Sequence, residues 1–502
     1  MHTVRDPLAR GALIARDRPA VLCGNTVLRY RDLAERVRRL GNALASLGLQ
    51  AGDRVAIIAN NCHRYVETYL AVPGSSFVLV PLNTRSAPAE IAFALQDAGV
   101  RVLLTDRPAA SYDDLVERVI RLPDGYEDLL ERTPPAPLPN EPNEHDIAGL
   151  FYTGGTTGRS KGVMLTHRNL IANAITALAW TRMTEDDRWL VMAPMFHAAG
   201  TCCVLTCCWL GASQVMLPSF TPEGALDLIE TTHATGTLAV PTMLNAMNQV
   251  QAEKPRNVAS LRMLSHGASP APLEILRRAH VLFPNAELLH LYGTTETSPI
   301  ATTFPHEERH LDDRLAGSAG QPALGVDVAA LGPDGIPLPP GEVGEIAVRG
   351  NNVMAGYWQL PEEDAKALRG GWYHTGDLGF LTDDGYLFLV DRLKDMVVTG
   401  GENVYTVEVE DALYRHPAVA EAAVFGIPDE RWGEAVHAVV VLRHPATEEE
   451  LCEHLRGIIA GYKIPKRIDL RTEPLPKSGA GKILKRELRE PFWVGRSTRI
   501  GN

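Results

Sequence analysis

The chain is poor in cysteine and in aromatic residues, and it has no excess of basic charge. Seven of its 502 residues are cysteine and 6% are aromatic. These cysteines do not make the even, regularly spaced set of a secreted disulfide framework. Acidic residues (61) outnumber basic ones (49), for a formal net charge of −12. Nucleic-acid-binding proteins usually carry a basic face, so we expect no nucleic-acid partner. A local basic site for a small anionic substrate still fits an acidic protein.

A signal peptide and an uninterrupted apolar run are also missing. The N-terminus lacks the basic start, apolar core and small-residue cleavage site of a signal peptide. The longest uncharged run, residues 191–220, is interrupted by prolines, a histidine and a glutamine. Such interruptions disfavour a membrane-spanning helix. We therefore expect a cytoplasmic protein without an integral membrane segment.

Four cysteines lie close together, at Cys202, Cys203, Cys207 and Cys208. A C-x₂₋₄-C zinc site usually lies on a turn, with further polar ligands nearby. This run has no flanking polar ligands and lacks the usual turn chemistry. We interpret the four residues as small apolar side chains in a buried segment.

Apolar runs alternate with amphipathic patterns through most of the chain. Residues 54–59, 77–80 and 100–104 are typical of buried strands, and the apolar spacing over 33–47 predicts a helix ending at Gly48. Alternation of this kind predicts an α/β fold with largely parallel sheets. The apolar content of 45% is sufficient for large cores.

The pattern changes near residue 391, where a strand-like run meets a dense charged cluster. About a hundred residues with their own βα pattern follow, which is enough for a separate domain. We predict a large N-terminal domain of stacked, largely parallel sheets with helices over residues 1–391. A hinge at 392–394 then leads to a small mobile α+β domain over residues 395–502.

The segment Tyr152–Gly162 combines glycines, threonines and a lysine. Glycines expose backbone N–H groups and threonine hydroxyls add donors, so this loop is typical of phosphate binding. A P-loop requires Gly-Lys-Ser/Thr followed by a helix. Here Lys161 precedes Gly162, and the apolar run 163–165 predicts a strand, which argues against a P-loop ATPase or kinase. The candidate phosphate-binding residues are Thr153, Gly154, Gly155, Thr156, Thr157, Gly158 and Lys161.

Two short motifs combine a glycine with an acidic residue. Tyr292-Gly293-Thr294-Thr295-Glu296 could present a hydroxyl and a carboxylate to phosphate and Mg²⁺, or it could be a turn with a helix-capping threonine. Asp377, just after a glycine, could accept the hydroxyls of a ribose, or it could be an ordinary β-turn aspartate.

Two further residues have both a functional and a structural interpretation. His197 stands among apolar residues, as either a catalytic histidine or a hydrogen-bonded core histidine. Lys482 ends the glycine-containing loop 476–482. It could reach a distant site and neutralise charge in a transition state, or it could belong to an exposed basic loop.

In this order the motifs resemble those of the acyl-CoA synthetase family. The family is part of the adenylate-forming superfamily, with nonribosomal-peptide adenylation domains and luciferases. The resemblance covers residues 8–490, and it is strongest in the glycine loop and in four other segments. These are residues 292–296, 375–377, 391–403 and 479–482.

The resemblance implies an ATP-dependent acyl-CoA ligase that uses Mg²⁺ and CoA. A fatty or aryl carboxylic acid would form an acyl-AMP with release of pyrophosphate, and the acyl group would then pass to CoA as a thioester. Loading of a separate carrier protein and a luciferase-like oxygenase remain alternatives. Residues 198–200 lack the aspartate typical of amino-acid-specific relatives, which favours a plain acyl or aryl acid. A homodimer is possible.

The resemblance also implies roles for single residues. Lys482 would bridge the substrate carboxylate and the α-phosphate, Thr295 would contact the α-phosphate, and Glu296 would bind Mg²⁺. Asp377 and Arg392 would hold the ribose. Tyr292 would flank the adenine, and Gly267, Ala268 and Ser269 would line the same cleft. Gly293 and Thr294 would also belong to the ATP-binding site.

Family members carry out both half-reactions in one site by rotating the small domain. Lys394 would be the hinge residue, and rotation would withdraw Lys482. The CoA path would then be lined by Gly400, Gly401, Glu402 and Asn403. The acyl pocket would be formed by His197, at its mouth, with Val240, Thr242, Met243, His266 and Gly267.

Three residues depart from the family pattern. Gly154 stands where relatives usually carry serine, Ser160 where they usually carry proline, and Thr406 where proline is common. We expect the first two to alter the affinity for ATP. None of the three removes an essential charge, so we expect an active enzyme.

Overall fold

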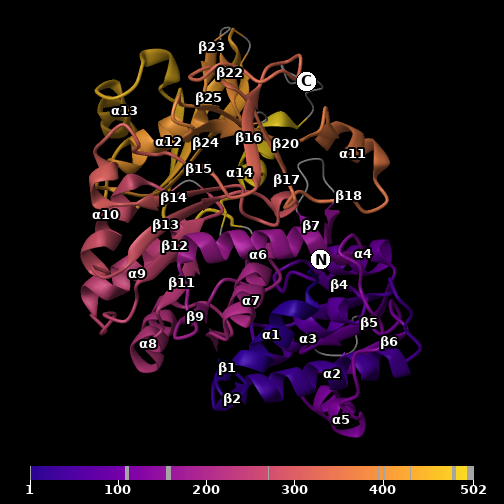
Figure 1. Ribbon diagram of the computed structural model, residues 1–502. Helices are drawn as coiled ribbons and strands as arrows, with labels where there is room; N and C mark the ends of the chain where they lie inside the picture. Colours follow the sequence, from indigo (N-terminus) through magenta and orange to yellow (C-terminus); the bar gives the residue numbers. More distant parts are fainter. Residues whose placement is uncertain are drawn as a thin grey trace.

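The protein is described from a computed structural model (Figure 1). The described residues are 2–107, 112–153, 160–269, 271–392, 395–399, 402–429, 431–477 and 482–494, without the side chains of residues 201 and 202.

The first sheet is parallel through its centre and antiparallel at both edges. Its nine strands run in the order β15 (Gln321–Pro322), β14 (Thr302–His306), β13 (Glu287–Tyr292), β12 (Met263–Gly267), β11 (Gly236–Ala239), β9 (Arg188–Val191), β10 (Ser213–Met216), β1 (Pro19–Cys23) and β2 (Thr26–Arg29).

The second sheet is parallel except for β18 and β8. Its seven strands run in the order β18 (Gly356–Tyr357), β8 (Lys161–Thr166), β7 (Ile147–Thr153), β4 (Val78–Pro81), β3 (Arg54–Ile58), β5 (Val100–Thr105) and β6 (Arg118–Arg121).

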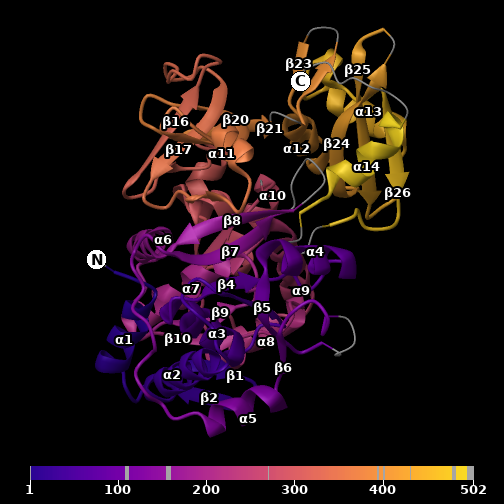
Figure 2. The same cartoon turned by 90° about the vertical axis from the view of Figure 1, so that its right-hand side faces the viewer.

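Helices pack on both faces of these sheets (Figures 1 and 2). One apolar core joins the two sheets through α6 and α7, with α1 packed on α7. A second core lies between the first sheet and α8, α9 and α10, and another lies between the second sheet and α4. The helices of this part are α1 (Arg5–Ile14), α2 (Tyr30–Ser46), α3 (His63–Gly74), α4 (Pro88–Ala98), α5 (Asp124–Arg132), α6 (His167–Thr181), α7 (Ala198–Leu210), α8 (Pro222–Thr232), α9 (Pro241–Glu253) and α10 (Leu273–Leu282), with the 3₁₀ turns η2 (Thr295–Thr297) and η3 (Glu308–Leu311).

The periodicity of the sequence gives these elements directly. In α2, Leu33, Val37, Leu40 and Leu44 are buried, and Gly48 has a φ of 87°, a left-handed conformation that glycine adopts without strain. The predicted strands are β3, β4 and β5. The α/β class with stacked, largely parallel sheets is therefore confirmed.

A third, antiparallel sheet leads to the C-terminal part of the chain. Its strands are β16 (Val326–Leu331), β17 (Gly344–Gly350), β20 (Trp372–Leu381) and β19 (Leu368–Arg369), and β21 (Leu387–Arg392) also pairs with β20. The helix α11 (Pro361–Ala367) lies beside β18 and β20.

The C-terminal part forms a smaller unit with its own sheet and its own apolar cores (Figure 2). The sheet order is β23 (Glu402–Val404), β22 (Val397–Thr399), β25 (Gly433–Leu442) and β24 (Val419–Asp429), with β26 (Arg467–Arg471) parallel to β25, and the helices are α12 (Thr406–Tyr414), α13 (Glu448–Arg456), α14 (Lys485–Trp493) and the turn η4 (Gly461–Lys463). The predicted small α+β domain is therefore present. Arg392 ends β21, whereas Leu393 and the predicted hinge residue Lys394 lie outside the described residues.

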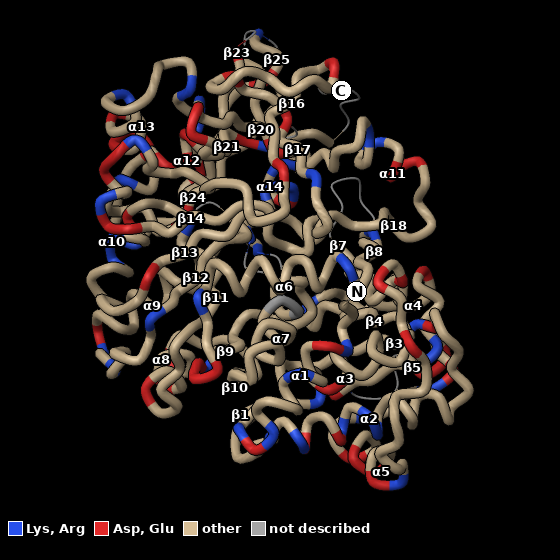
Figure 3. The backbone as a smooth tube through the Cα atoms, viewed as in Figure 1, with Lys and Arg blue, Asp and Glu red and all other residues tan. Residues whose placement is uncertain are grey.

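The sequence predicts neither a zinc site at the clustered cysteines nor a membrane-spanning helix. Cys207 and Cys208 are buried and Cys203 is half-buried in α7, as interpreted. Across the described ranges, no group of His, Cys, Asp or Glu side chains is arranged to hold a metal ion by itself. In the same ranges, no helix has both the length and the hydropathy required to cross a bilayer. Acidic and basic residues are interspersed along the elements visible in Figure 3.

Candidate active site

The predicted substrate-binding segments follow the carboxyl ends of neighbouring parallel strands. His197 comes after β9, Val240 to Met243 come after β11, Gly267 to Ser269 end and follow β12, and Gly293 to Glu296 follow β13. Because β9, β11, β12 and β13 are parallel neighbours, their carboxyl ends meet at one edge of the sheet. Such an edge is the usual ligand site of an α/β sheet.

Two glycines allow the ends of β12 and β13 to come close to neighbouring backbone. A Cβ atom on Gly267 would lie 2.1 Å from the carbonyl oxygen of Leu291. Gly293 has a φ of 158°, and a Cβ there would lie 1.9 Å from the carbonyl oxygen of Pro299. A larger residue at either position would therefore displace the backbone that presents Thr294 to Glu296.

The two predicted ribose-binding residues form one cluster with Tyr292. Asp377 and Arg392 are register partners on β20 and β21, with 3.1 Å between Asp377 Oδ1 and Arg392 Nε. The Tyr292 hydroxyl donates to Asp377 Oδ2 at 2.8 Å. Burial raises the pKa of Tyr292, and the carboxylate of Asp377 raises it further. Tyr292 is thus a neutral donor that orients a buried carboxylate.

The predicted phosphate side of the site is formed by β7, β8 and β18. Lys161 forms an ion pair with Glu363, and its Nζ lies 4.9 Å from the centre of the Tyr357 ring. The Tyr357 hydroxyl donates to Glu296 Oε1 at 3.0 Å. Glu296, the predicted Mg²⁺ ligand, therefore lies beside the base of the glycine loop. A carboxylate oriented by a hydroxyl is a suitable oxygen ligand for Mg²⁺.

The centre of the glycine loop lies outside the described residues, namely Gly154, Gly155, Thr156, Thr157, Gly158 and Arg159. The ends of the loop are described. The Ser160 hydroxyl donates to the carbonyl oxygen of Thr153 at 2.8 Å, and Thr153 pairs with Lys161 across β7 and β8. A strand follows the loop, as predicted, where a P-loop has a helix.

The structure adds residues that the sequence analysis missed. Glu363 pairs with Lys161, which lowers the pKa of Glu363 to about 2. Tyr357 and Tyr373 lie against Glu296 and Thr294, with 3.3 Å between the Thr294 hydroxyl and the Tyr373 hydroxyl. The run Gly356-Tyr357-Trp358, just before an acidic helix start, could have indicated a site residue. Buried tyrosines often serve as hydrogen-bond donors.

His197 is the residue before α7, where its backbone turns from the end of β9 into the helix. Asn61, another residue that the sequence analysis missed, holds the backbone that leads from β9 to His197. It accepts from the backbone N–H of Met195 at 2.9 Å and donates to the carbonyl oxygen of Ala193 at 3.0 Å. The rings of Phe196 and His197 lie 4.4 Å apart.

The charge of Lys482, from the smaller C-terminal unit, acts on His197. Burial, together with the positive charges of Lys482 and Arg85, lowers the pKa of His197 to about 4. Since such an effect requires proximity, Lys482 lies near the mouth of the predicted acyl pocket. His197 is therefore neutral at physiological pH.

The other pocket and CoA-path residues are less closely grouped. Val240 and Met243 are buried, and Thr242 is half-buried, at the start of α9. His266 is fully buried and stacks on His290 and His306 at 4.9 and 5.2 Å between ring centres. Glu402 and Asn403 are exposed on β23, at the top of Figure 1 and away from β12 and β13. Gly400 and Gly401 lie outside the described residues.

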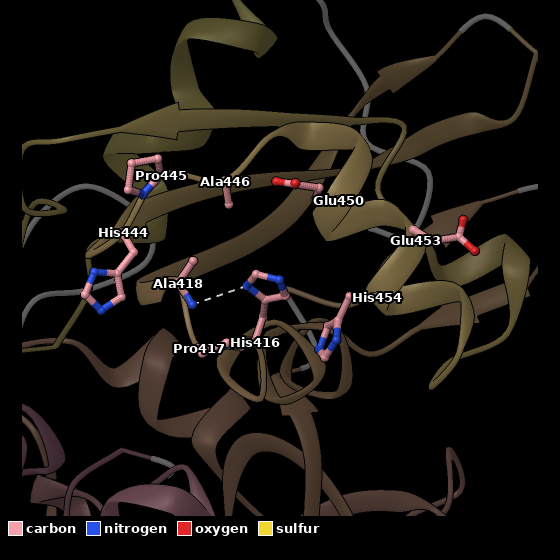
Figure 4. Close-up of a pocket in the computed structure, with 9 residues that line it drawn as sticks. All are labelled: His416, Pro417, Ala418, His444, Pro445, Ala446, Glu450, Glu453 and His454. Atoms are coloured by element: carbon pink, nitrogen blue, oxygen red, sulfur yellow. Dashed lines mark hydrogen bonds between the residues drawn. The ribbon is translucent and has the colours of Figure 1, made fainter.

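A separate hollow of about 600 Å³ lies on the surface of the smaller unit (Figure 4). Two His-Pro-Ala segments, 416–418 and 444–446, line it together with α13. Two of its three histidine rings are held internally, since His416 Nδ1 accepts from the backbone N–H of Ala418 at 3.3 Å and His454 bonds the carbonyl oxygen of Ala412 at 3.0 Å. This hollow shares no residue with the candidate active site.

Comparison with protein families gives two matches along the chain. Residues 9–358 match the model of the AMP-binding enzyme family, and residues 408–482 match that of the AMP-binding enzyme C-terminal domain. The second match ends at Lys482. The large and small units of the fold therefore correspond to the two parts of this family.

Individual relatives are similar over nearly the whole chain. A feruloyl-CoA synthase of Amycolatopsis sp is 42% identical over 482 residues, covering 94% of this chain and 96% of the relative. A long-chain-fatty-acid–CoA ligase of Mycobacterium tuberculosis is 34% identical, covering 92% of this chain and 93% of the relative.

A solved structure agrees with both the fold and the chemistry. The o-succinylbenzoate CoA synthetase of Bacillus subtilis, in complex with an acyl-adenylate intermediate, has a TM-score of 0.87 at 30% identity and covers all of both chains. The same enzyme has been solved with ATP and magnesium, at a TM-score of 0.87. The chain therefore belongs to the AMP-binding enzyme family, and it is an ATP-dependent, AMP-forming acyl-CoA ligase.

Proposed function

We propose that this ligase activates an aryl-substituted carboxylic acid of the feruloyl type. The observation that carries the proposal is the 42% identity to feruloyl-CoA synthases along 94% of the chain. The pocket composition supports it. The rings of Phe196 and His197 lie together, and the ring of His266 stacks on that of His290. In the proposed pocket, these flat rings would line the mouth and one wall. Flat rings suit an aromatic substrate better than a flexible long acyl chain.

In the first half-reaction, the carboxylate attacks the α-phosphorus of ATP and pyrophosphate leaves. The attacking and leaving groups are both negative, so the site must offset their repulsion. Lys482 supplies positive charge near His197, Thr295 contacts the α-phosphate, and Glu296 holds Mg²⁺, which when bound neutralises phosphate charge. Lys161 gives up its ion pair with Glu363 and binds the leaving pyrophosphate instead.

The nucleoside is held at the other end of the site. Asp377 accepts from the ribose hydroxyls, with Arg392 beside it, and Tyr292 keeps the carboxylate oriented. The adenine lies against Gly267, Ala268 and Ser269. Buried carboxylates that accept ribose hydroxyls serve the same purpose in other nucleotide-binding folds.

In the second half-reaction, the thiol of CoA attacks the acyl-adenylate and AMP leaves. The smaller domain turns about Lys394, which removes Lys482 and brings the segment 400–403 to the adenylate. The distant position of β23 is consistent with such a movement. A free thiol has a pKa near 8.5, so this step does not require Lys482.

An acid panel tests the proposed substrate. The purified chain is given ATP, Mg²⁺, CoA and one acid: ferulic acid, a medium-chain or long-chain fatty acid, or o-succinylbenzoate. Mass spectrometry should detect feruloyl-CoA and AMP as products, and ferulic acid should have the highest kcat/KM of the acids. Preference for a fatty acid would refute the aryl assignment, and release of ADP would refute adenylation itself.

Lys482→Ala tests the assignment of the two half-reactions. We expect ATP–pyrophosphate exchange to fall by about 10²-fold or more, the usual effect of losing a charge that stabilises a transition state. Transfer from a supplied acyl-adenylate to CoA should persist. An equal loss in both half-reactions would show that Lys482 has another role.

A carrier protein is the second candidate acceptor. A fatty acid–[acyl-carrier-protein] ligase of Streptomyces coeruleorubidus is 35% identical and covers 95% of this chain and 93% of the relative. We expect CoA to be the better acceptor when it is compared with a pantetheinylated carrier protein at equal thiol concentration. A cytoplasmic location and a homodimer remain predictions.

A further inference from the structure

A cluster of buried polar side chains joins the end of β21 to the smaller domain. Both carboxylate oxygens of Asp391 accept from Thr406: the backbone N–H donates to Oδ2, and the hydroxyl donates to Oδ1 at 3.1 Å. Lys485 donates to the same hydroxyl oxygen at 2.8 Å and lies 2.8 Å from Glu410 Oε1. We call Asp391, Thr406, Glu410 and Lys485 the hinge network.

The hinge network is shielded from water. Asp391 is 5% exposed and Thr406 is fully buried, while the side chains of Glu410 and Lys485 are 14% and 18% exposed. Glu410 also accepts from the backbone N–H of Val424 at 2.7 Å. Buried charges require partners, so removal of one member leaves an uncompensated group and disturbs the others.

The network spans two domains. Asp391 lies on β21, in the antiparallel sheet that carries Asp377 on β20. Thr406 begins α12 of the smaller domain, whose own sheet is formed by β22 to β26. The two hydrogen bonds between Asp391 and Thr406 therefore fix the smaller domain relative to the ribose cluster.

The hinge network connects the ribose cluster to the segment that carries Lys482. Asp391 adjoins Arg392, which pairs with Asp377. At the other end, Lys485 is the first residue of α14, shortly after Lys482. The chain is further fixed near this point, because the backbone N–H of Leu484 donates to the carbonyl oxygen of Pro476 at 2.8 Å.

We propose that the hinge network is a positioning device that holds Lys482, relative to Asp377 and Arg392, in the arrangement required for acyl-adenylate formation. The inference rests on the proposed function. It adds that Thr406 and Lys485 act on the first half-reaction without contacting the substrate. If the smaller domain turns for the second half-reaction, the hydrogen bonds from Thr406 to Asp391 must break.

Thr406 permits a graded test. Serine keeps both hydrogen bonds to Asp391, valine keeps the backbone N–H but loses the hydroxyl, and proline has neither donor. Proline is tolerated at the first position of a helix, so Thr406→Pro should keep α12. We expect kcat for ATP–pyrophosphate exchange to fall about tenfold for each hydrogen bond lost to the buried carboxylate.

Thioester formation is the readout that separates positioning from general damage. Transfer of a supplied acyl-adenylate to CoA should stay within about twofold of the parent enzyme in all three Thr406 variants. The bonds to Asp391 must break for that step in any case, and Lys485 keeps its ion pair with Glu410 when the Thr406 hydroxyl is lost. KM for ATP should change less than kcat. Thr406→Ser should restore parental exchange.

Lys485→Met gives an independent measurement with a matched control. Lys463 forms an ion pair with Glu408 on the same helix α12, at 2.6 Å, outside the hinge network. We expect Lys485→Met to slow exchange at least tenfold and Lys463→Met to leave exchange unchanged. Each protein is first checked for its unfolding midpoint.

Three outcomes would overturn the inference. The exchange rates could be unaffected by Thr406→Val and Thr406→Pro, both half-reactions could fall alike, or Lys463→Met could slow exchange as much as Lys485→Met. If a proline variant does not fold, Thr406→Val still decides the matter. Absence of exchange in the parent enzyme would instead refute the proposed function.

Discussion

Tyr292→Phe is the substitution that tests the ribose cluster most directly, because it removes one oxygen atom and no charge. The Tyr292 hydroxyl donates to Asp377 Oδ2 at 2.8 Å, and Asp377 is 6% exposed. Its other oxygen, Oδ1, pairs with Arg392. Phenylalanine leaves Oδ2 without this donor in a position that water reaches poorly.

The magnitude follows from the loss of one hydrogen bond to a buried charge. Such a bond contributes about 1.5–3 kcal/mol, which corresponds to about 10–100-fold in a binding constant. The Arg392 side chain is 46% exposed and still holds Oδ1. We therefore expect the lower end, a rise of about tenfold in KM for ATP, with a smaller change in kcat.

ATP–pyrophosphate exchange at saturating acid measures this KM. Tyr126→Phe is the matched control, since Tyr126 donates to the buried carboxylate of Glu67 at 2.6 Å far from the candidate site. Both variants should lose unfolding free energy, but only Tyr292→Phe should raise KM. If KM is unchanged in Tyr292→Phe, or rises equally in Tyr126→Phe, the cluster stabilises the fold and does not bind the nucleotide.

Three further substitutions have defined outcomes. Glu363→Gln should lower KM for ATP about two- to fivefold in the same assay, because this partly exposed ion pair with Lys161 contributes about 0.5–1 kcal/mol. Asp187→Asn should cost about 1.5–3 kcal/mol of unfolding free energy in urea without changing KM, since it removes the charge of a buried carboxylate that accepts from the partly exposed Arg262. Burial lowers the pKa of the His167 imidazole from 6.5 to about 4. As the pH drops from 6.5 towards 4, the imidazole becomes protonated in the unfolded chain but not in the folded one, so the free energy of unfolding falls. His167→Asn should reduce that fall, and an unchanged pH dependence of the unfolding midpoint would contradict it.

Much of the fold could be predicted because its elements have strong local patterns. The apolar period of α2 and the continuous apolar runs of β3 and β5 each correspond to one type of element. The order of strands within the sheets could not be predicted in this way. Neighbours such as β9 and β11 are separated by many residues, and their pairing depends on packing between distant segments.

The candidate site was predictable where its chemistry depends on glycines and on charged residues in a fixed order. Asp377 and Arg392 are an example, since both were assigned to the ribose before their pairing across two strands was known. Glu363 and Tyr357 were missed, because their importance comes from contacts with Lys161 and Glu296, not from a local pattern. A side chain that acts through another residue leaves little signal in its own neighbourhood.

Two of the cations assigned to ATP already have acidic partners in the structure. Lys161 pairs with Glu363 and Arg392 pairs with Asp377. In a chain of net charge −12, nucleotide binding is then an exchange of partners and not the neutralisation of bare cations. The two acids nevertheless differ in consequence. Glu363 competes with phosphate for its lysine, whereas Asp377 is itself the acceptor for ribose, so removal of the first charge should tighten ATP binding and removal of the second should weaken it. Opposite signs for Glu363→Gln and Asp377→Asn in one exchange assay would distinguish this arrangement from a general electrostatic effect, in which loss of either negative charge would favour the anionic nucleotide.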